Sequence, residues 1–204
     1  QLHRGERERP DGRPLLERSS SAAWEVIAMF LSIQQKFILD TLKKLNCIRQ
    51  QQLHTLVRGR FQQDGFEITQ ARMDAMLRQL RTGTADVRLD DGLVWLSNAQ
   101  PDARRLEAID VMLELTGRKP QEFNASREPP RLLRFAYGRD ELRPFTVASL
   151  DAASAELLER DTAERIVWIA DSGEPPKGLA LPPKHFFAAR QPDGTHRFYG
   201  SNGP

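Results

Sequence analysis

The stretch that contains the change from helical to strand periodicity is TQARMDAMLRQLRTGTADVRLDDGLVW, residues 69–95. Four apolar residues recur there at helical spacing and predict one buried helix face: Met73, Met76, Leu77 and Leu80. Thr69 is a favourable N-cap for this helix, and Gly83 is expected to end it. Further on, apolar and polar residues alternate on both sides of Asp91-Gly92, a dipeptide typical of a tight hairpin turn. The stretch therefore predicts a helix followed by a two-stranded hairpin.

Two further helices are expected on the N-terminal side of this stretch. Ser32 and Gln35 have the spacing of a capping box and open a helix that Asn46 is expected to end. A second, short helix is expected over residues 49–60. Three helices and a hairpin within about seventy residues are the pattern of a winged helix-turn-helix domain, which we assign to residues 29–98. The third helix of such a domain enters the major groove, so duplex DNA is the predicted partner.

The predicted DNA-binding residues are polar and lie on or near the third helix. Its outward positions include Asp74 and Gln79, and the residues expected to contact DNA there are Gln70, Arg72, Arg81 and, near the edge, Arg78. Glutamine suits contacts with base edges and arginine suits phosphates. Arg58, Arg60 and the hairpin residue Arg88 are expected to add backbone contacts. The alternative is an ordinary solvated face on a winged helix that contacts another protein.

The charge distribution favours DNA by a small margin. Residues 29–98 hold ten Lys or Arg and seven acidic residues, whereas the whole chain carries a net charge of +2. Asp86, Asp90 and Asp91 make the predicted hairpin more acidic than is usual for a segment that grips phosphates. DNA binding is therefore the leading hypothesis, and the excess of positive charge behind it is modest.

The second half predicts a small α/β domain at residues 118–204, after a linking helix within residues 99–117. That helix, expected over residues 101–116, is apolar around much of its circumference and should be buried. The later elements are expected as two strands, a helix, a strand and a terminal hairpin, at residues 132–137, 144–150, 152–160, 165–170 and 186–199. The predicted fold class is therefore α+β, with an N-terminal winged helix followed by a small α/β domain.

No catalytic or metal-binding constellation is evident. A nuclease core of the PD-(D/E)XK type places an acid and a Glu-x-Lys on adjacent strands, yet none of the six lysines is expected in mid-strand. The histidines His54, His185 and His196 have no partner at metal-ligand spacing. Cys47 is expected to be a small buried residue. We predict a protein that is not an enzyme and has no cofactor, and a divergent nuclease is the remaining alternative.

The composition is that of a soluble globular protein. The chain has 204 residues, of which 39% are hydrophobic and 28% charged, and no apolar run is long enough to span a membrane. The lone Cys47 fits a reducing compartment, so the cytoplasm is the predicted location. Residues 1–28 are rich in Arg, Glu, Pro, Gly and Ser and are expected to form a disordered tail.

Three segments also carry a resemblance to known proteins: residues 32–45, residues 105–110, and residues 182–187 together with 197–199. In these the chain resembles a group of short bacterial proteins encoded with mobile elements, which pair a winged helix with a small α/β domain. The layout is similar to that of the replication-relaxation family, whose second domain is a degenerate nuclease-like core. The resemblance implies a DNA-associated accessory or regulatory role for a mobile genetic element. A homodimer is a further expectation, separate from the resemblance.

Overall fold

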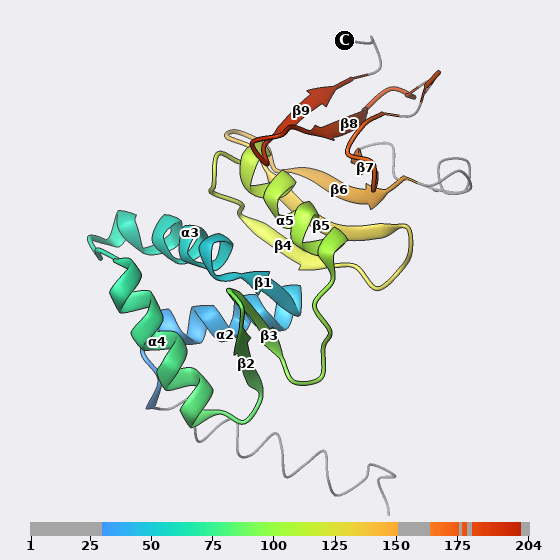
Figure 1. The fold of residues 1–204 in the computed structure, drawn as a ribbon. Coiled ribbons are helices and arrows are strands. Elements are labelled where there is room, and N and C mark those ends of the chain that lie inside the picture. Colours follow the sequence, from blue (N-terminus) through green and yellow to red (C-terminus); the bar gives the residue numbers. More distant parts are fainter. Residues whose placement is uncertain (1–29, 151–163, 176, 179–180, 201–204) are drawn as a thin grey trace, which may run out of the picture.

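The first half of the chain folds into three helices and a three-stranded antiparallel sheet (Figure 1). A computed structural model describes residues 30–150, 164–175, 177–178 and 181–200. The elements of the first half are α2 (Ile33–Leu45), β1 (Cys47–Arg49), α3 (Gln50–Phe61), the 3₁₀ turn η1 (Gln62–Asp64), α4 (Gln70–Gly83), β2 (Val87–Asp90) and β3 (Leu93–Leu96). The strands pair in the order β1-β3-β2.

The local sequence signals act where they were expected. The Ser32 hydroxyl accepts a hydrogen bond from the backbone N–H of Gln35 at 3.2 Å, and the side-chain oxygen of Gln35 accepts one from the backbone N–H of Ser32 at 3.0 Å. Asn46 ends α2 with a φ of 66°. Thr69 caps α4 by accepting from the Arg72 amide at 3.3 Å. The predicted capping box, helix end and N-cap are therefore confirmed.

The hairpin is also where the alternation placed it, while the third strand of the small sheet was missed. The turn between β2 and β3 consists of Asp91 and Gly92, whose φ angles of 43° and 72° suit a primed hairpin turn. The expected second helix began at Arg49, but residues 47–49 form β1, which pairs with β3. Three residues are too few to show a strand period, and this strand is stabilised by pairing with a distant segment.

The second half forms α5 (Ala103–Leu115) and a six-stranded mixed sheet. The strands lie in chain order: β4 (Glu122–Ala125), β5 (Arg131–Tyr137), β6 (Arg143–Ser149), β7 (Arg165–Ile169), β8 (His185–Arg190) and β9 (His196–Tyr199). The β6–β7 and β7–β8 pairs are parallel and the others antiparallel. Strand β4 was not predicted, and the expected helix at residues 152–160 lies outside the described residues, as does the expected tail at 1–28. The described chain is of the α+β class, as predicted.

Helix α5 joins the two halves, as Figure 1 shows. It packs against β1 and α3 on one side and against β5 and β6 on the other. Ala108, Ile109, Val111 and Met112 are fully buried and belong to a hydrophobic cluster that includes residues of both halves. No helix in the described part of the chain is long and apolar enough to cross a membrane.

Candidate nucleic-acid interface

Helix α4 has one buried face and one face open to solvent. Its buried residues are the four predicted ones, Met73, Met76, Leu77 and Leu80. With 3.6 residues per turn, the stripe opposite them consists of Ala71, Ala75, Arg78 and Thr82. Of these, Ala75 is half-buried and the other three are exposed. Small residues at the centre of an exposed face allow another molecule to approach the helix backbone closely.

The four predicted contact residues of α4 are all exposed, but their arrangement differs from the expected one. Arg78 lies in the central stripe and not near the edge, because it is two turns from Ala71 on the same side. Arg72 and Arg81 lie on opposite flanks of that stripe. In the described chain, the side chains of Arg78 and Arg81 form no ion pair or hydrogen bond. The two arginines are therefore available to bind an anion.

The glutamines of α4 are engaged within the protein. Gln70 donates a hydrogen bond to Asp74 at 2.8 Å, one turn further along the helix. Gln79 accepts one from the Gln35 side chain of α2 at 2.9 Å. Of the two outward glutamines of the predicted face, Gln79 links α4 to α2, whereas Gln70 uses one N–H for Asp74 and keeps its other N–H and its amide oxygen for a further contact.

Arg58 lies near the start of α4. A hollow of about 710 Å³ between the end of α3 and the start of α4 is lined by Arg58, Gln70 and their neighbours. His54 also lines this hollow, and its Nε2 is within hydrogen-bond distance of the Ile68 carbonyl oxygen, at 2.7 Å. Arg58 is exposed and lines the same hollow as Gln70, so these two of the predicted DNA-binding residues lie on one surface.

Arg60 and Arg88 are not part of this surface. Arg60 is paired with Asp64 at 3.0 Å and lines a different groove, on the other side of α3. Arg88 lies opposite Trp95, which in turn lies opposite Cys47, so these three share one face of the small sheet. The other face carries Val94 and packs against the helices. Arg88 is therefore exposed but directed away from the helical layer.

The hairpin does not form a long basic wing. Its tip is held against the start of α3, where the Gln50 amide donates to the Gly92 carbonyl at 2.8 Å. Asp90 and Asp91 are exposed at this tip. The acidic character expected from the sequence therefore sits at the part of a hairpin that usually follows the phosphate backbone.

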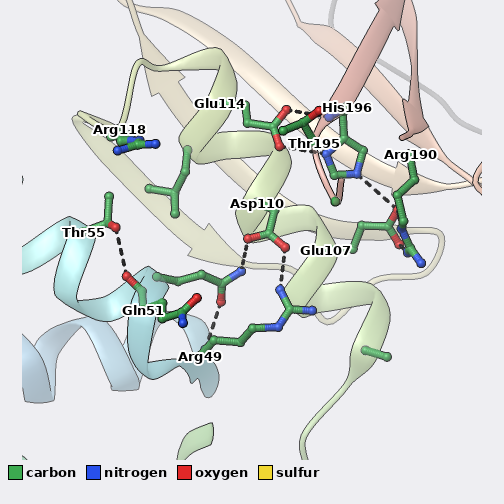
Figure 2. A pocket seen from close by; sticks show the side chains of 14 residues that line it. Arg49, Gln51, Thr55, Glu107, Asp110, Glu114, Arg118, Arg190, Thr195 and His196 are labelled. Atoms are coloured by element: carbon green, nitrogen blue, oxygen red, sulfur yellow. Dashed lines mark hydrogen bonds and ion pairs between the residues drawn. The ribbon is translucent and has the colours of Figure 1, made fainter. Parts of the chain in front are cut away.

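A polar cleft of about 650 Å³ runs over α5, between α3 and the β8–β9 hairpin (Figure 2). On the α3 side, Asp110 forms an ion pair with Arg49 and accepts a hydrogen bond from the Gln52 amide nitrogen at 2.6 Å. Gln52 also donates to the Leu106 carbonyl at 2.7 Å. These bonds attach the first half of the protein to α5.

On the other side of the cleft, α5 is attached to the large sheet by charged groups. Glu107, buried on α5, is bound by Arg190 of β8 and by Nε2 of His196 of β9 at 3.3 Å. Nδ1 of His196 lies 3.0 Å from Glu114, and Figure 2 shows the ring between the two carboxylates. A neutral imidazole has a single N–H, so only the protonated ring can donate to both.

The pKa shifts agree with this geometry. Burial alone would raise the pKa of Glu107, but the hydrogen bonds from His196 and Arg190 outweigh it and hold the pKa below its ordinary value. Burial alone would lower the pKa of His196, but the hydrogen bonds to Glu107 and Glu114 raise it. The result is a charged cluster in which each member has a partner. In its protonated form, His196 holds α5 to the sheet through both carboxylates.

The Glu107–His196–Glu114 cluster was missed because His196 is 82 residues from Glu114 and 89 residues from Glu107 in the chain. Glu107 and Glu114 stand two turns apart on α5, and that spacing was the available signal. In the described ranges, no group of three or more His, Cys, Asp or Glu side chains is placed to hold a metal ion. Cys47 is fully buried, as expected, and burial raises the pKa of its thiol.

Comparisons with protein-family models, with curated proteins and with solved structures found no match to this chain.

Proposed function

We propose that residues 30–98 form a winged helix-turn-helix domain that binds duplex DNA. Helix, strand, two helices and a hairpin, with strand order β1-β3-β2, is the element order of that domain class. In such a domain α4 would be the helix that enters the major groove. The protein would then act on DNA as an accessory or regulatory factor without an enzymatic activity of its own.

The observation that carries this proposal is the open outer face of α4. Helix α4 packs against β2 and is bonded to α2 through Gln79. In Figure 1 it lies on the side of the first half away from the six-stranded sheet. A helix that reads a groove must be accessible. Had the second half covered α4, a module that binds another protein would have been the better hypothesis.

The positions on α4 suggest a division of roles. Arg78, in the central stripe, would contact base edges, and the neighbouring Ala71 and Ala75 would let the backbone approach. Arg72 and Arg81, on the two flanks, would contact phosphates on either side of the groove. The acidic hairpin tip would contribute little, so affinity would depend on the helix.

Fluorescence anisotropy with a labelled random-sequence duplex at low salt tests the proposal. We expect the double variant Arg78→Ala with Arg81→Ala to bind at least about tenfold more weakly than the parent protein, because each substitution removes a charged hydrogen bond to DNA, which contributes about 1.5–3 kcal/mol. The matched control is Arg127→Ala with Arg197→Ala, which removes the same charge from exposed positions of the second half. Absence of duplex binding by the parent protein, or equal weakening by both variants, would contradict the proposal.

A further inference from the structure

A second groove lies on the other side of α3 from the α3–α4 hollow. Arg58 lines that hollow, whereas Arg60, two residues further on, lines this groove. The groove has a volume of about 640 Å³. One wall comes from α2 and α3, and the other from the α5–β4 connection, the start of β4 and the β5–β6 turn. We call it the interlayer groove.

The interlayer groove is lined by basic side chains and by no carboxylate. The basic residues are Lys44, Arg60, Arg118, Lys119 and Arg139. Lys44 is paired with Asp40 at 2.7 Å, and Arg60 with Asp64 at 3.0 Å. In the part of the chain that the structure describes, the side chains of Arg118, Lys119 and Arg139 have no ion pair or hydrogen bond. Three cations without an ion pair therefore line one concave surface, and one of them, Arg118, also lines the polar cleft over α5 (Figure 2).

Helix ends explain part of this charge. Lys44 and Arg60 are in the last turns of α2 and α3, where a cation offsets the partial negative charge of the helix terminus. Arg139 cannot be explained in this way, because it lies in the turn between β5 and β6. Helix ends therefore account for some of the positive charge of the groove and do not account for Arg139.

Arg118 occupies its position at a conformational cost. Its φ of 68° is left-handed, a conformation that glycine adopts freely and arginine rarely. A Cβ atom added at Gly59 of α3 would lie 3.0 Å from the Arg118 carbonyl oxygen, so the two walls touch there. An arginine in a strained backbone conformation at the contact between the walls points to a role for its side chain.

The groove also offers aromatic surface next to the cations. Phe37 and Tyr137 are half-buried in its walls, and Lys44 lies over the Phe123 ring, 5.7 Å from its centroid. Cations that follow a backbone and aromatic rings beside them are the combination that binds single-stranded nucleic acid. The volume of about 640 Å³ is in the range that holds a ligand of drug size, comparable to one or two nucleotides.

We propose that the interlayer groove binds a single strand of nucleic acid, with Arg118, Lys119 and Arg139 on its phosphates. This site is separate from the outer face of α4 and does not depend on duplex binding by that helix. The protein would therefore be able to hold a duplex on one surface and an unpaired strand on another.

The test is fluorescence anisotropy with labelled oligo(dT) and, in parallel, a labelled blunt duplex, over a range of salt concentrations. The first variant combines Arg118→Gly with Arg139→Ala, and the control is Arg127→Ala with Arg197→Ala. Arg118→Gly relieves the strained φ, so the melting temperature of this single variant should be unchanged or higher. For the double variant, oligo(dT) affinity should fall at least about tenfold, and the slope of log K against log salt should become shallower by about 1.4, since each lost phosphate contact contributes about 0.7.

Duplex affinity should remain unchanged in this variant, and Arg78→Ala with Arg81→Ala should retain oligo(dT) binding. Failure of the α4 variant to affect duplex binding would count against the proposed function alone. The single-strand site would be overturned if the groove variant bound oligo(dT) no more weakly than the control. It would also be overturned if the groove variant and the α4 variant each lost affinity for oligo(dT) and for the duplex to the same extent. A third contradicting result would be displacement of labelled oligo(dT) by millimolar phosphate or poly-glutamate as readily as by unlabelled oligo(dT).

Discussion

Replacing Glu107 by glutamine tests whether the charged cluster on α5 holds the two sides of the protein together. The substitution keeps the size of the side chain and removes its charge. Only 6% of the Glu107 side chain and 1% of the His196 side chain are exposed, whereas that of Arg190 is 46% exposed. The change therefore acts mainly on the buried bond between Glu107 and the protonated His196.

The size of the effect follows from these exposures. A hydrogen bond to a buried charged group contributes about 1.5–3 kcal/mol. The half-exposed Arg190 adds less than about 1 kcal/mol, because solvent screens it. We therefore expect Glu107→Gln to lower the free energy of unfolding by about 2–3 kcal/mol. For a chain of this length that corresponds to a fall in melting temperature of about 5–10 °C.

The effect should depend on pH in a defined window. The pKa of His196 lies above its ordinary 6.5, so its contribution is complete below pH 6.5 and is lost as the pH rises through the higher folded value. The pKa of Glu107 lies below its ordinary 4.5, so its contribution is complete above pH 4.5 and is lost as the pH falls through the lower folded value. The difference between parent and variant should be greatest between about pH 4.5 and 6.5.

Urea unfolding at pH 5.5 and pH 9 measures this difference. Glu128→Gln is the matched control, because Glu128 is 72% exposed and lies 3.6 Å from Arg134. It should change the free energy of unfolding by less than about 1 kcal/mol at both pH values. Equal effects of the two substitutions, or an effect of Glu107→Gln that does not shrink at pH 9, would refute the reasoning.

Other predictions concern local structure. Ser32→Ala removes the hydroxyl of the capping box and should cost about 1 kcal/mol in urea unfolding, and an unchanged midpoint would show that the cap is dispensable. Cys47 should resist a thiol reagent until the protein unfolds, and rapid labelling of the native protein would contradict its burial. Gly59→Ala should destabilise the protein because the new Cβ would crowd the Arg118 carbonyl oxygen. Gly83→Ala should be neutral or stabilising by up to about 1 kcal/mol, because a Cβ there meets open space. The reverse order of the two melting temperatures would be inconsistent with the packing at Gly59.

The parts of the fold that were predicted correctly depend on local sequence. The Ser32–Gln35 capping box, the end of α2 at Asn46 and the Asp91-Gly92 turn each involve residues within a few positions of one another. Strand β1 was missed because three residues are too few to show a strand period. Strand β4 has four residues, as β2 and β3 do, but no turn dipeptide such as Asp91-Gly92 stands beside it. The parallel pairs β6–β7 and β7–β8 of the large sheet also depend on contacts between segments that are separated in the chain.

The candidate interface was predicted in part. Periodicity predicts the buried face of α4 and hence the exposure of Arg72, Arg78 and Arg81. The phase of the same helix places Arg78 at the centre of the outer face. The pairing of Gln79 with Gln35 depends on how α4 packs on α2. The interlayer groove was not predictable, because its basic residues come from segments that only the tertiary fold brings together.

The salt dependence of duplex binding tests most directly whether α4 lies in a DNA groove. Arg72 and Arg81 flank the central stripe of α4 and should each contact one phosphate. Each phosphate contact on B-form DNA contributes about 0.9 to the slope of log K against log salt. Arg72→Ala with Arg81→Ala should therefore make that slope shallower by about 1.8, while Arg127→Ala with Arg197→Ala leaves it unchanged. A slope that is the same in the parent protein and the α4 variant would contradict the account.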